Sequence, residues 1–193
     1  MDQTLNLIGK NLSSSFNGYS FSDFHPQVQK NLLRLLIFRP NLSLDNIIKE
    51  IAGWQPNEQL YYLEFLILKI SERINRAINI EPQVIVLSGR KFYRVDFKLA
   101  LTDHVMSYLP PILYFVELDG FSFHDRTREE FTKARQRLRN LQREGAKVYP
   151  FSAEEVFKDP ARCVLETVRG LERDIIERRY MIVQCLCNTG EWS

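Results

Sequence analysis

Cysteine is scarce in this sequence and long apolar runs are missing, and both shortages limit what the protein can be. The 193 residues include three cysteines, Cys163, Cys185 and Cys187, and an odd number of thiols without a secretory leader argues against a disulfide framework. No apolar run reaches the roughly 18 residues that a membrane-spanning helix needs. The N-terminus also lacks the charged and apolar regions of a signal peptide. We therefore expect reduced thiols, no contact with a membrane and a cytoplasmic protein.

Signature motifs of several enzyme classes are missing as well. There is no glycine-rich phosphate loop, no GxSxG elbow and no HExxH helix, so P-loop, hydrolase-triad and zinc-protease functions have no support. Cys185 and Cys187 offer two thiolates, but no further cluster of Cys or His completes a zinc site. The net charge is only +2 and 45% of the residues are hydrophobic. This composition is typical of an ordinary globular domain with a core of its own.

One apolar segment that ends in two acids organises the rest of the chain. Residues 112–120 read ILYFVELDG, and a short apolar run between a proline pair and a glycine predicts a strand buried on both faces. Residues two apart in a strand point the same way, so Glu117 and Asp119 are expected side by side at its end. Adjacent carboxylates repel unless a proton or a cation neutralises them, which favours a divalent metal. The alternative is a strand end that simply reaches solvent.

Apolar periodicity predicts an alternation of helices and strands around this segment. The predicted helices are residues 27–38, 44–52, 56–76, 127–144 and 160 to about 179, and the predicted strands are residues 83–87, 92–100, 112–119 and 147–151. A turn at residues 88–91 joins the first two strands as a hairpin. In the second strand, strict alternation predicts one apolar face and one polar face. The apolar face holds Tyr93, Val95, Phe97 and Leu99, and the polar face holds Arg94, Asp96 and Lys98.

Positive charge is concentrated on the helix that follows the central strand. Residues 126–147 carry eight basic and three acidic side chains. A basic helix face is often only a solvated surface, but a position beside two carboxylates favours contact with phosphate. The candidate nucleic-acid contacts are Lys133, Arg135, Arg137 and Arg139. Residues four apart share a helix face, so these form two rows, Arg135 with Arg139 and Lys133 with Arg137.

Three phrases and their order resemble the PD-(D/E)XK nuclease superfamily, in the branch of the very-short-patch-repair endonucleases. They are YRVDF at residues 93–97, VELDGFSFH at 116–124 and RTREEFTKARQRLRNLQREGAKVYPFS at 126–152, and the resemblance covers residues 56–171. It implies an α/β fold with a restriction-endonuclease-like core, in which helices flank a mixed central sheet in the order αβββαβα. The expected domains are an N-terminal arm with short helices at 1–55, a nuclease-like domain at 56–180 and a C-terminal tail at 181–193.

The resemblance also implies a metal site. By position in the motif, Asp96 and Glu117 would hold Mg²⁺ or Mn²⁺, with the Leu118 carbonyl as a further ligand. These are the hard oxygen ligands that magnesium prefers, and the ion would activate water for attack on phosphorus. A helix glutamate often completes such a site, and Glu64 is the first candidate with Glu58 as the alternative.

Two departures from the family pattern leave the activity open. Asp119 stands where the motif has a lysine, so the charge-stabilising side chain must come from elsewhere, with Lys98, Lys133 or Gln136 as candidates. Ala134 stands where the branch usually has an aspartate. His124 matches a recurrent histidine of the branch, which implies a general base or a phosphate ligand, although a histidine that only holds the strand-to-helix turn is equally compatible.

The sequence thus leads us to expect a metal-dependent endonuclease that hydrolyses phosphodiester bonds, in DNA rather than RNA. The alternative is a catalytically inactive nucleic-acid-binding or protein-interaction module on the same fold. Residues 1–55, which the resemblance does not cover, would then contact a protein partner or a second copy of the chain.

Overall fold

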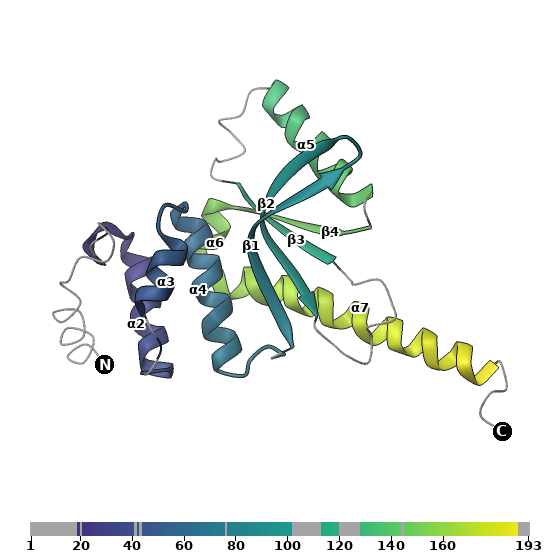
Figure 1. Ribbon diagram of the computed structural model, residues 1–193, viewed down its shortest axis with the longest axis horizontal. Coiled ribbons are helices and arrows are strands. Elements are labelled where there is room, and N and C mark those ends of the chain that lie inside the picture. The colour runs from purple at the N-terminus through teal and green to yellow at the C-terminus, as the bar shows by residue number, and fades with distance from the viewer. Residues whose placement is uncertain are drawn as a thin grey trace. The chain divides into compact units, whose positions relative to one another are not determined.

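The computed structural model describes residues 19, 21–40, 42, 44–75, 77–101, 113–119, 128–143 and 145–188. The helices are η1 (Phe21–Asp23), α2 (Pro26–Phe38), α3 (Leu44–Ile51), α4 (Pro56–Ile70), α5 (Arg128–Arg143), α6 (Ala153–Lys158) and α7 (Pro160–Asn188). The strands are β1 (Ile78–Ser88), β2 (Lys91–Leu101), β3 (Leu113–Asp119) and β4 (Lys147–Ser152). Figure 1 labels the main elements along the ribbon.

The strands form one mixed sheet in the order β1-β2-β3-β4. Strand β2 pairs antiparallel with β1 on one side and with β3 on the other. Helix α4 precedes the first three strands, α5 separates β3 from β4, and α6 and α7 follow. The predicted α/β class and the predicted chain order of helices and strands are therefore confirmed.

The chain forms two compact units, each built from segments that are distant in sequence. The first unit contains Met1–Arg76, Leu118–Thr127 and Pro150–Val164, and the second contains Ala77–Glu117, Arg128–Tyr149 and Leu165–Ser193. Each unit combines separate segments that pack together, whereas the predicted domains, with boundaries at residues 55 and 180, are continuous stretches of sequence. The predicted domain boundaries therefore stay a prediction. Within the described ranges, no helix has both the length and the apolarity needed to cross a membrane.

Helices of the first unit begin where the sequence supplies caps. Helix α2 starts at Pro26, whose fixed φ suits the first helical turn, and the His25 ring accepts the Gln27 N–H at 3.3 Å. Helix α4 also starts at a proline, and the Glu58 carboxylate accepts the Gln55 N–H at 3.0 Å. The apolar stripes of α2, α3 and α4 then form the core of this unit, with the fully buried side chains Leu32, Leu35, Ile48, Ile51, Leu60, Leu63 and Phe65.

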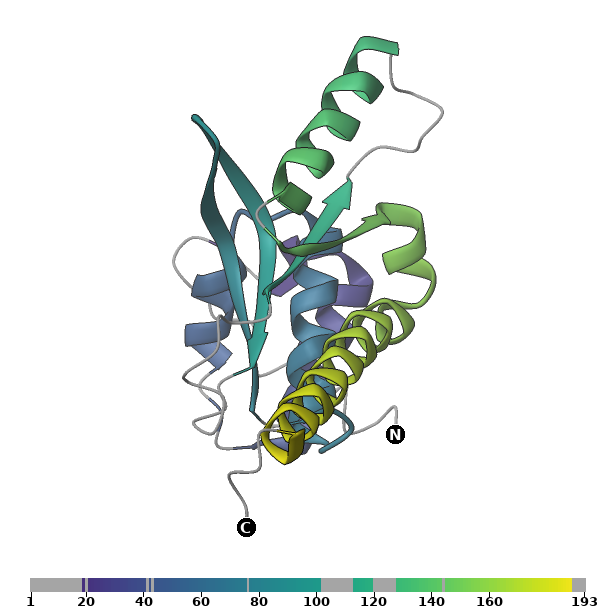
Figure 2. The ribbon, with the colours of Figure 1, turned by 90° about the vertical axis from the view of Figure 1, so that its right-hand side faces the viewer.

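The β1–β2 hairpin is longer than predicted and closes where the sequence places its turn. Strand β1 begins at Ile78, five residues before the expected start at 83. Ser88 pairs with Lys91 across a two-residue loop, and Gly89 has a φ of +61°. A glycine with positive φ at the first loop position is typical of a type II′ turn, whose twist matches that of the strands. The hairpin is the long twisted ribbon in Figure 2.

Strand β2 changes the side toward which it packs at Asp96. Phe97 pairs directly with Val116 of β3, and directly paired residues on antiparallel strands share a face. Val95 instead packs in a cluster with Phe115, and neighbouring β3 residues point to opposite faces. The two halves of β2 therefore contribute to opposite sides of the sheet.

The predicted single apolar face of β2 is accordingly wrong, and the reason lies on the partner strand. The β1–β2 ladder omits the pair of Gln83 with Asp96. Gln83 has a φ of +52°, which is left-handed backbone that side chains other than glycine seldom adopt. Gln83 thus lies opposite the point at which the packing side of β2 changes.

Two helix ends also differ from their predictions. Helix α4 stops at Ile70 and not at residue 76, and Glu72 then has a φ of 59°, which helical backbone does not allow. Helix α7 continues to Asn188, past the expected end near residue 179. No proline or glycine interrupts residues 171–188, so the chain has no breaker where the tail was predicted to begin.

Candidate active site

Asp96 and Glu117 occupy neighbouring strands at the same level of the sheet. The β2–β3 ladder pairs Phe97 with Val116, and the next residues along the two strands are Asp96 and Glu117. Asp96 and Glu117 thus directly follow the last paired residues of the two strands. Glu117 is buried and Asp96 is half-buried.

The carboxylate of Glu117 is held by an arginine from the basic helix. Arg137 Nη2 on α5 lies 2.8 Å from Glu117 Oε2 and 3.0 Å from Oε1. The same nitrogen donates to the backbone carbonyl of Arg94 on β2. A buried carboxylate needs a cation or several hydrogen-bond donors, and Arg137 meets this need. Arg137 was not among the residues, Lys98, Lys133 and Gln136, that the sequence offered in place of the motif lysine.

Helix α5 is fixed to the hairpin by further polar contacts on its inner side. Asn140 Nδ2 donates to the Tyr93 hydroxyl at 2.7 Å, and Ser88 Oγ donates to the Asn140 carbonyl at 2.8 Å. Leu141 packs below them in the cluster with Val95. Helix α5 therefore has a defined orientation, in which Arg137 is half-buried while Lys133, Arg135 and Arg139 are exposed.

Lys98 is directed away from the candidate site. Its Nζ lies 2.9 Å from Glu81 Oε2 and 3.1 Å from Oε1, and Glu81 is its direct partner on β1. Because the ammonium group already has an acidic partner on the outer strand, we do not retain Lys98 as a catalytic residue.

Glu64 is engaged by helix α2. Its side chain is only 2% exposed, and Arg34 binds it in bidentate fashion, with Nη1 2.7 Å from Oε2 and Nη2 3.3 Å from Oε1. Asn31 Nδ2 donates to the same Oε2 at 3.2 Å. Both carboxylate oxygens therefore have partners within the helical core. This arrangement explains the buried acid without a metal.

Glu58, the alternative to Glu64, directly follows a residue that contacts the ELD sequence at residues 117–119. Asn57 Nδ2 donates to the Leu118 carbonyl at 3.4 Å, and Leu118 stands between the two acids of the ELD sequence. Glu58, the residue after Asn57, is buried and caps the start of α4. Of the two glutamates considered, Glu58 is the one whose chain neighbour touches the motif.

Two of the predicted site residues lie wholly or partly outside the described part of the chain. His124 lies outside the described residues, and so does the side chain of Asp119, although Asp119 is the last residue of β3. Among the described side chains, no group of three or more His, Cys, Asp and Glu residues could hold a metal ion.

A second polar network joins β3, β4 and α7. Tyr114 Oη donates to Asp174 Oδ2 at 2.5 Å, and Lys147 Nζ lies 2.6 Å from the same oxygen. Burial raises the pKa of Tyr114, and its bond to Asp174 raises it further. Burial alone would raise the pKa of Asp174, but the hydrogen bonds from Lys147 and Tyr114 outweigh it and hold that pKa below its ordinary value. The network fastens α7 to the sheet.

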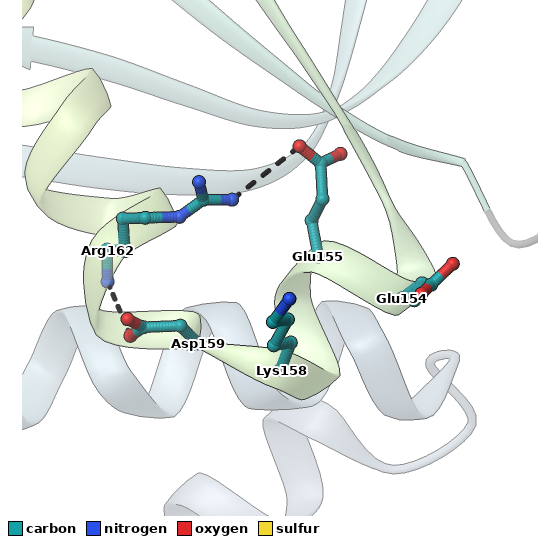
Figure 3. A pocket seen from close by; sticks show the side chains of 5 residues that line it. All are labelled: Glu154, Glu155, Lys158, Asp159 and Arg162. Carbon is teal, nitrogen blue, oxygen red and sulfur yellow. Dashed lines mark hydrogen bonds and ion pairs between the residues drawn. The ribbon is translucent and has the colours of Figure 1, made fainter.

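An open pocket of about 480 Å³ lies at the junction of α6 and α7. Glu154, Glu155, Lys158, Asp159 and Arg162 line it (Figure 3). Within it, Arg162 lies 3.6 Å from Glu155 and its backbone N–H donates to Asp159 at 2.9 Å. The pocket does not include any of the candidate catalytic residues.

Comparisons of this chain with models of protein families, with curated proteins and with solved structures found no match.

Proposed function

We propose that this protein is a metal-dependent endonuclease of the PD-(D/E)XK type that cuts phosphodiester bonds in DNA. The observation that carries the proposal is the β2–β3 ladder, whose last pair, Phe97 with Val116, is followed by Asp96 on one strand and by Glu117 on the other. Carboxylates that lie close together repel each other and bind a divalent cation well. The chain order of the elements and the mixed sheet agree with the core that the motif resemblance implies.

The residues present are suited to magnesium or manganese. Asp96 and Glu117, both in the second compact unit, offer hard carboxylate oxygen atoms. A bound ion would polarise the scissile phosphate and acidify a water molecule for attack on phosphorus.

Arg137 takes the place of the motif lysine in this proposal. Asp119 cannot supply positive charge, whereas the Arg137 guanidinium is already at Glu117. Planar guanidinium groups bind phosphate oxygens in bidentate fashion. Arg137 would therefore position the scissile phosphate and stabilise the charge that develops on it.

The second candidate function is a catalytically inactive module that binds nucleic acid. The observation that favours it is the same ion pair, because a carboxylate that is paired with Arg137 is satisfied without a metal. Ala134, in place of the aspartate that the branch usually has, points in this direction too. Dependence of cleavage on a divalent ion separates the two functions.

The test is an assay of purified protein on supercoiled, linear and single-stranded DNA, in magnesium, in manganese and in chelator. We expect nicking and cutting only with a divalent ion. Asp96→Ala and Glu117→Ala should abolish cleavage, whereas Glu154→Ala, which removes an exposed carboxylate on α6, should leave it unchanged. If both motif variants cut at the wild-type rate, the proposed site is wrong. If the wild-type protein binds DNA in every buffer but never cuts, the inactive module is the better description.

A further inference from the structure

The tip of the β1–β2 hairpin presents large apolar side chains to solvent. Ile85 is 69% exposed, Leu87 54% and Phe92 74%. Leu87 pairs directly with Phe92, and Ile85 lies two residues from Leu87 on the same face. Three large apolar groups gathered on one exposed face are a common mark of a binding surface.

The opposite face of the hairpin already has its own core. Val84, Val86 and Tyr93 pack against the cluster of Val95 with Leu141 of helix α5. Since side chains alternate between the two faces of a strand, the inner set is covered by α5 and the outer set is left open. The exposed side chains therefore lie on the outer face of the hairpin, whereas helix α5 already covers the inner face.

Positive charge surrounds the exposed apolar face. Arg90, Lys91 and Arg94 are exposed, and Arg94 is the direct cross-strand partner of Ile85, which places it on the outer face. Residues 84–95 contain no acidic side chain. A face that combines cations, an aromatic ring and no acid is complementary to a polyanion with flat apolar rings.

We propose that the outer face of the β1–β2 hairpin is a nucleic-acid contact surface. Phe92 and Leu87 meet the bases, and Arg90 and Arg94 meet the phosphates. A two-stranded β-ribbon is narrow enough to enter the major groove of DNA, and exposed Phe, Leu and Ile side chains can insert between base steps or stack on single-stranded bases. The choice of ligand rests on the proposed function, but the contact itself does not require that the protein cuts.

Charge favours nucleic acid as the occupant of this surface. Arg94 stands beside Ile85 on the outer face, and residues 84–95 contain no acidic side chain that would repel a polyanion. The face therefore attracts a nucleic-acid backbone in a salt-dependent way.

The experiment measures binding of fluorescent duplex DNA, single-stranded DNA and single-stranded RNA in chelator, where no cutting occurs. We expect Phe92→Ala combined with Leu87→Ala to weaken binding of at least one probe about tenfold, the effect of losing one stacked base. The control is Tyr180→Ala on α7, which removes a ring that is 62% exposed but lies far from the hairpin in sequence. Arg90→Gln with Arg94→Gln should flatten the salt dependence by roughly 0.9 log units for each contact on duplex DNA.

The proposal is overturned if the hairpin variants bind every probe as the wild type does. It is also overturned if they lose only dimerisation or only binding to vesicles of anionic lipid, because the face then serves a second copy of the chain or a membrane. A wild-type protein that binds no probe refutes it as well. Hairpin-dependent binding without cleavage in magnesium would instead refute the proposed nuclease and leave the contact surface standing. Thermal melting checks that the variants fold, which the exposure of both side chains leads us to expect.

Discussion

Replacing Arg34 by methionine tests whether Glu64 is a structural residue or a metal ligand. In the structure the guanidinium makes two contacts with the Glu64 carboxylate, at 2.7 and 3.3 Å. After the replacement, the carboxylate keeps only the Asn31 amide among these partners. A buried charge would then be left poorly compensated, so we expect a marked loss of stability.

The size of the loss follows from the burial of the two partners. Removing one member of a buried ion pair costs about 3–5 kcal/mol. Glu64 is 2% exposed but Arg34 is 35% exposed, so water can enter the vacated space and the lower end, about 3 kcal/mol, is appropriate. For a chain of this size, each kcal/mol lowers Tm by about 2–4 °C. The expected fall in Tm for Arg34→Met is therefore roughly 6–12 °C.

Thermal and urea unfolding in chelator are the measurements, since no metal can then contribute. The double variant Arg34→Met with Glu64→Leu should recover most of the lost stability, because it removes the uncompensated charge together with its partner. If instead Glu64 is a metal ligand, Arg34→Met should melt within about 2 °C of the wild type, and Glu64→Gln should lose metal-induced stabilisation. That result would refute the structural role argued here.

Three further outcomes are expected. The pKa of Asp174 is held below its ordinary value. The stability that this carboxylate contributes is therefore present above its unfolded-state pKa and is lost as pH falls through its folded-state pKa. Asp174→Asn should reduce this loss of stability at acid pH, as measured by unfolding experiments from pH 6 to 2. Gly170→Ala should destabilise despite a gain of about 1 kcal/mol in helix propensity, because the new methyl would overlap the Tyr149 hydroxyl; a higher Tm would show that Tyr149 moves aside freely. Arg137→Gln should reduce cleavage far more than Arg139→Gln, which changes an exposed residue of α5.

Local periodicity predicted much of the fold, because each element carries its own apolar pattern. Helix α5 and strand β3 begin and end within one residue of their predicted bounds. The change of face at Asp96 has no such local signal, since it depends on the left-handed backbone of Gln83 on the neighbouring strand. Alternation within β2 alone could only predict a single continuous face.

In the candidate site too, residues within short motifs were predicted, whereas contacts between distant parts of the chain were not. The acids of β2 and β3 were found from short motifs, but the partner of Glu64 lies 30 positions away along the chain. A clue was present in α2, where Asn31 is a polar residue between the buried Val28 and Leu35 on one helix face. A polar group on an apolar stripe needs a partner inside the core, and Glu64 is that partner.

The pair of Arg137 with Glu117 links the two parts of the proposed function. If a phosphate group takes Arg137 as its partner, the buried Glu117 loses its ion pair with this arginine, which is costly. Binding of nucleic acid through Arg137 is therefore favourable only when a divalent ion compensates Glu117, and by reciprocity nucleic acid must then strengthen binding of the ion. A nuclease should accordingly bind an uncut DNA analogue more tightly in calcium than in chelator, and Arg137→Gln should remove the difference. A chain that binds equally well in both buffers uses only exposed cations such as Lys133, Arg135 and Arg139, and that behaviour identifies the inactive module.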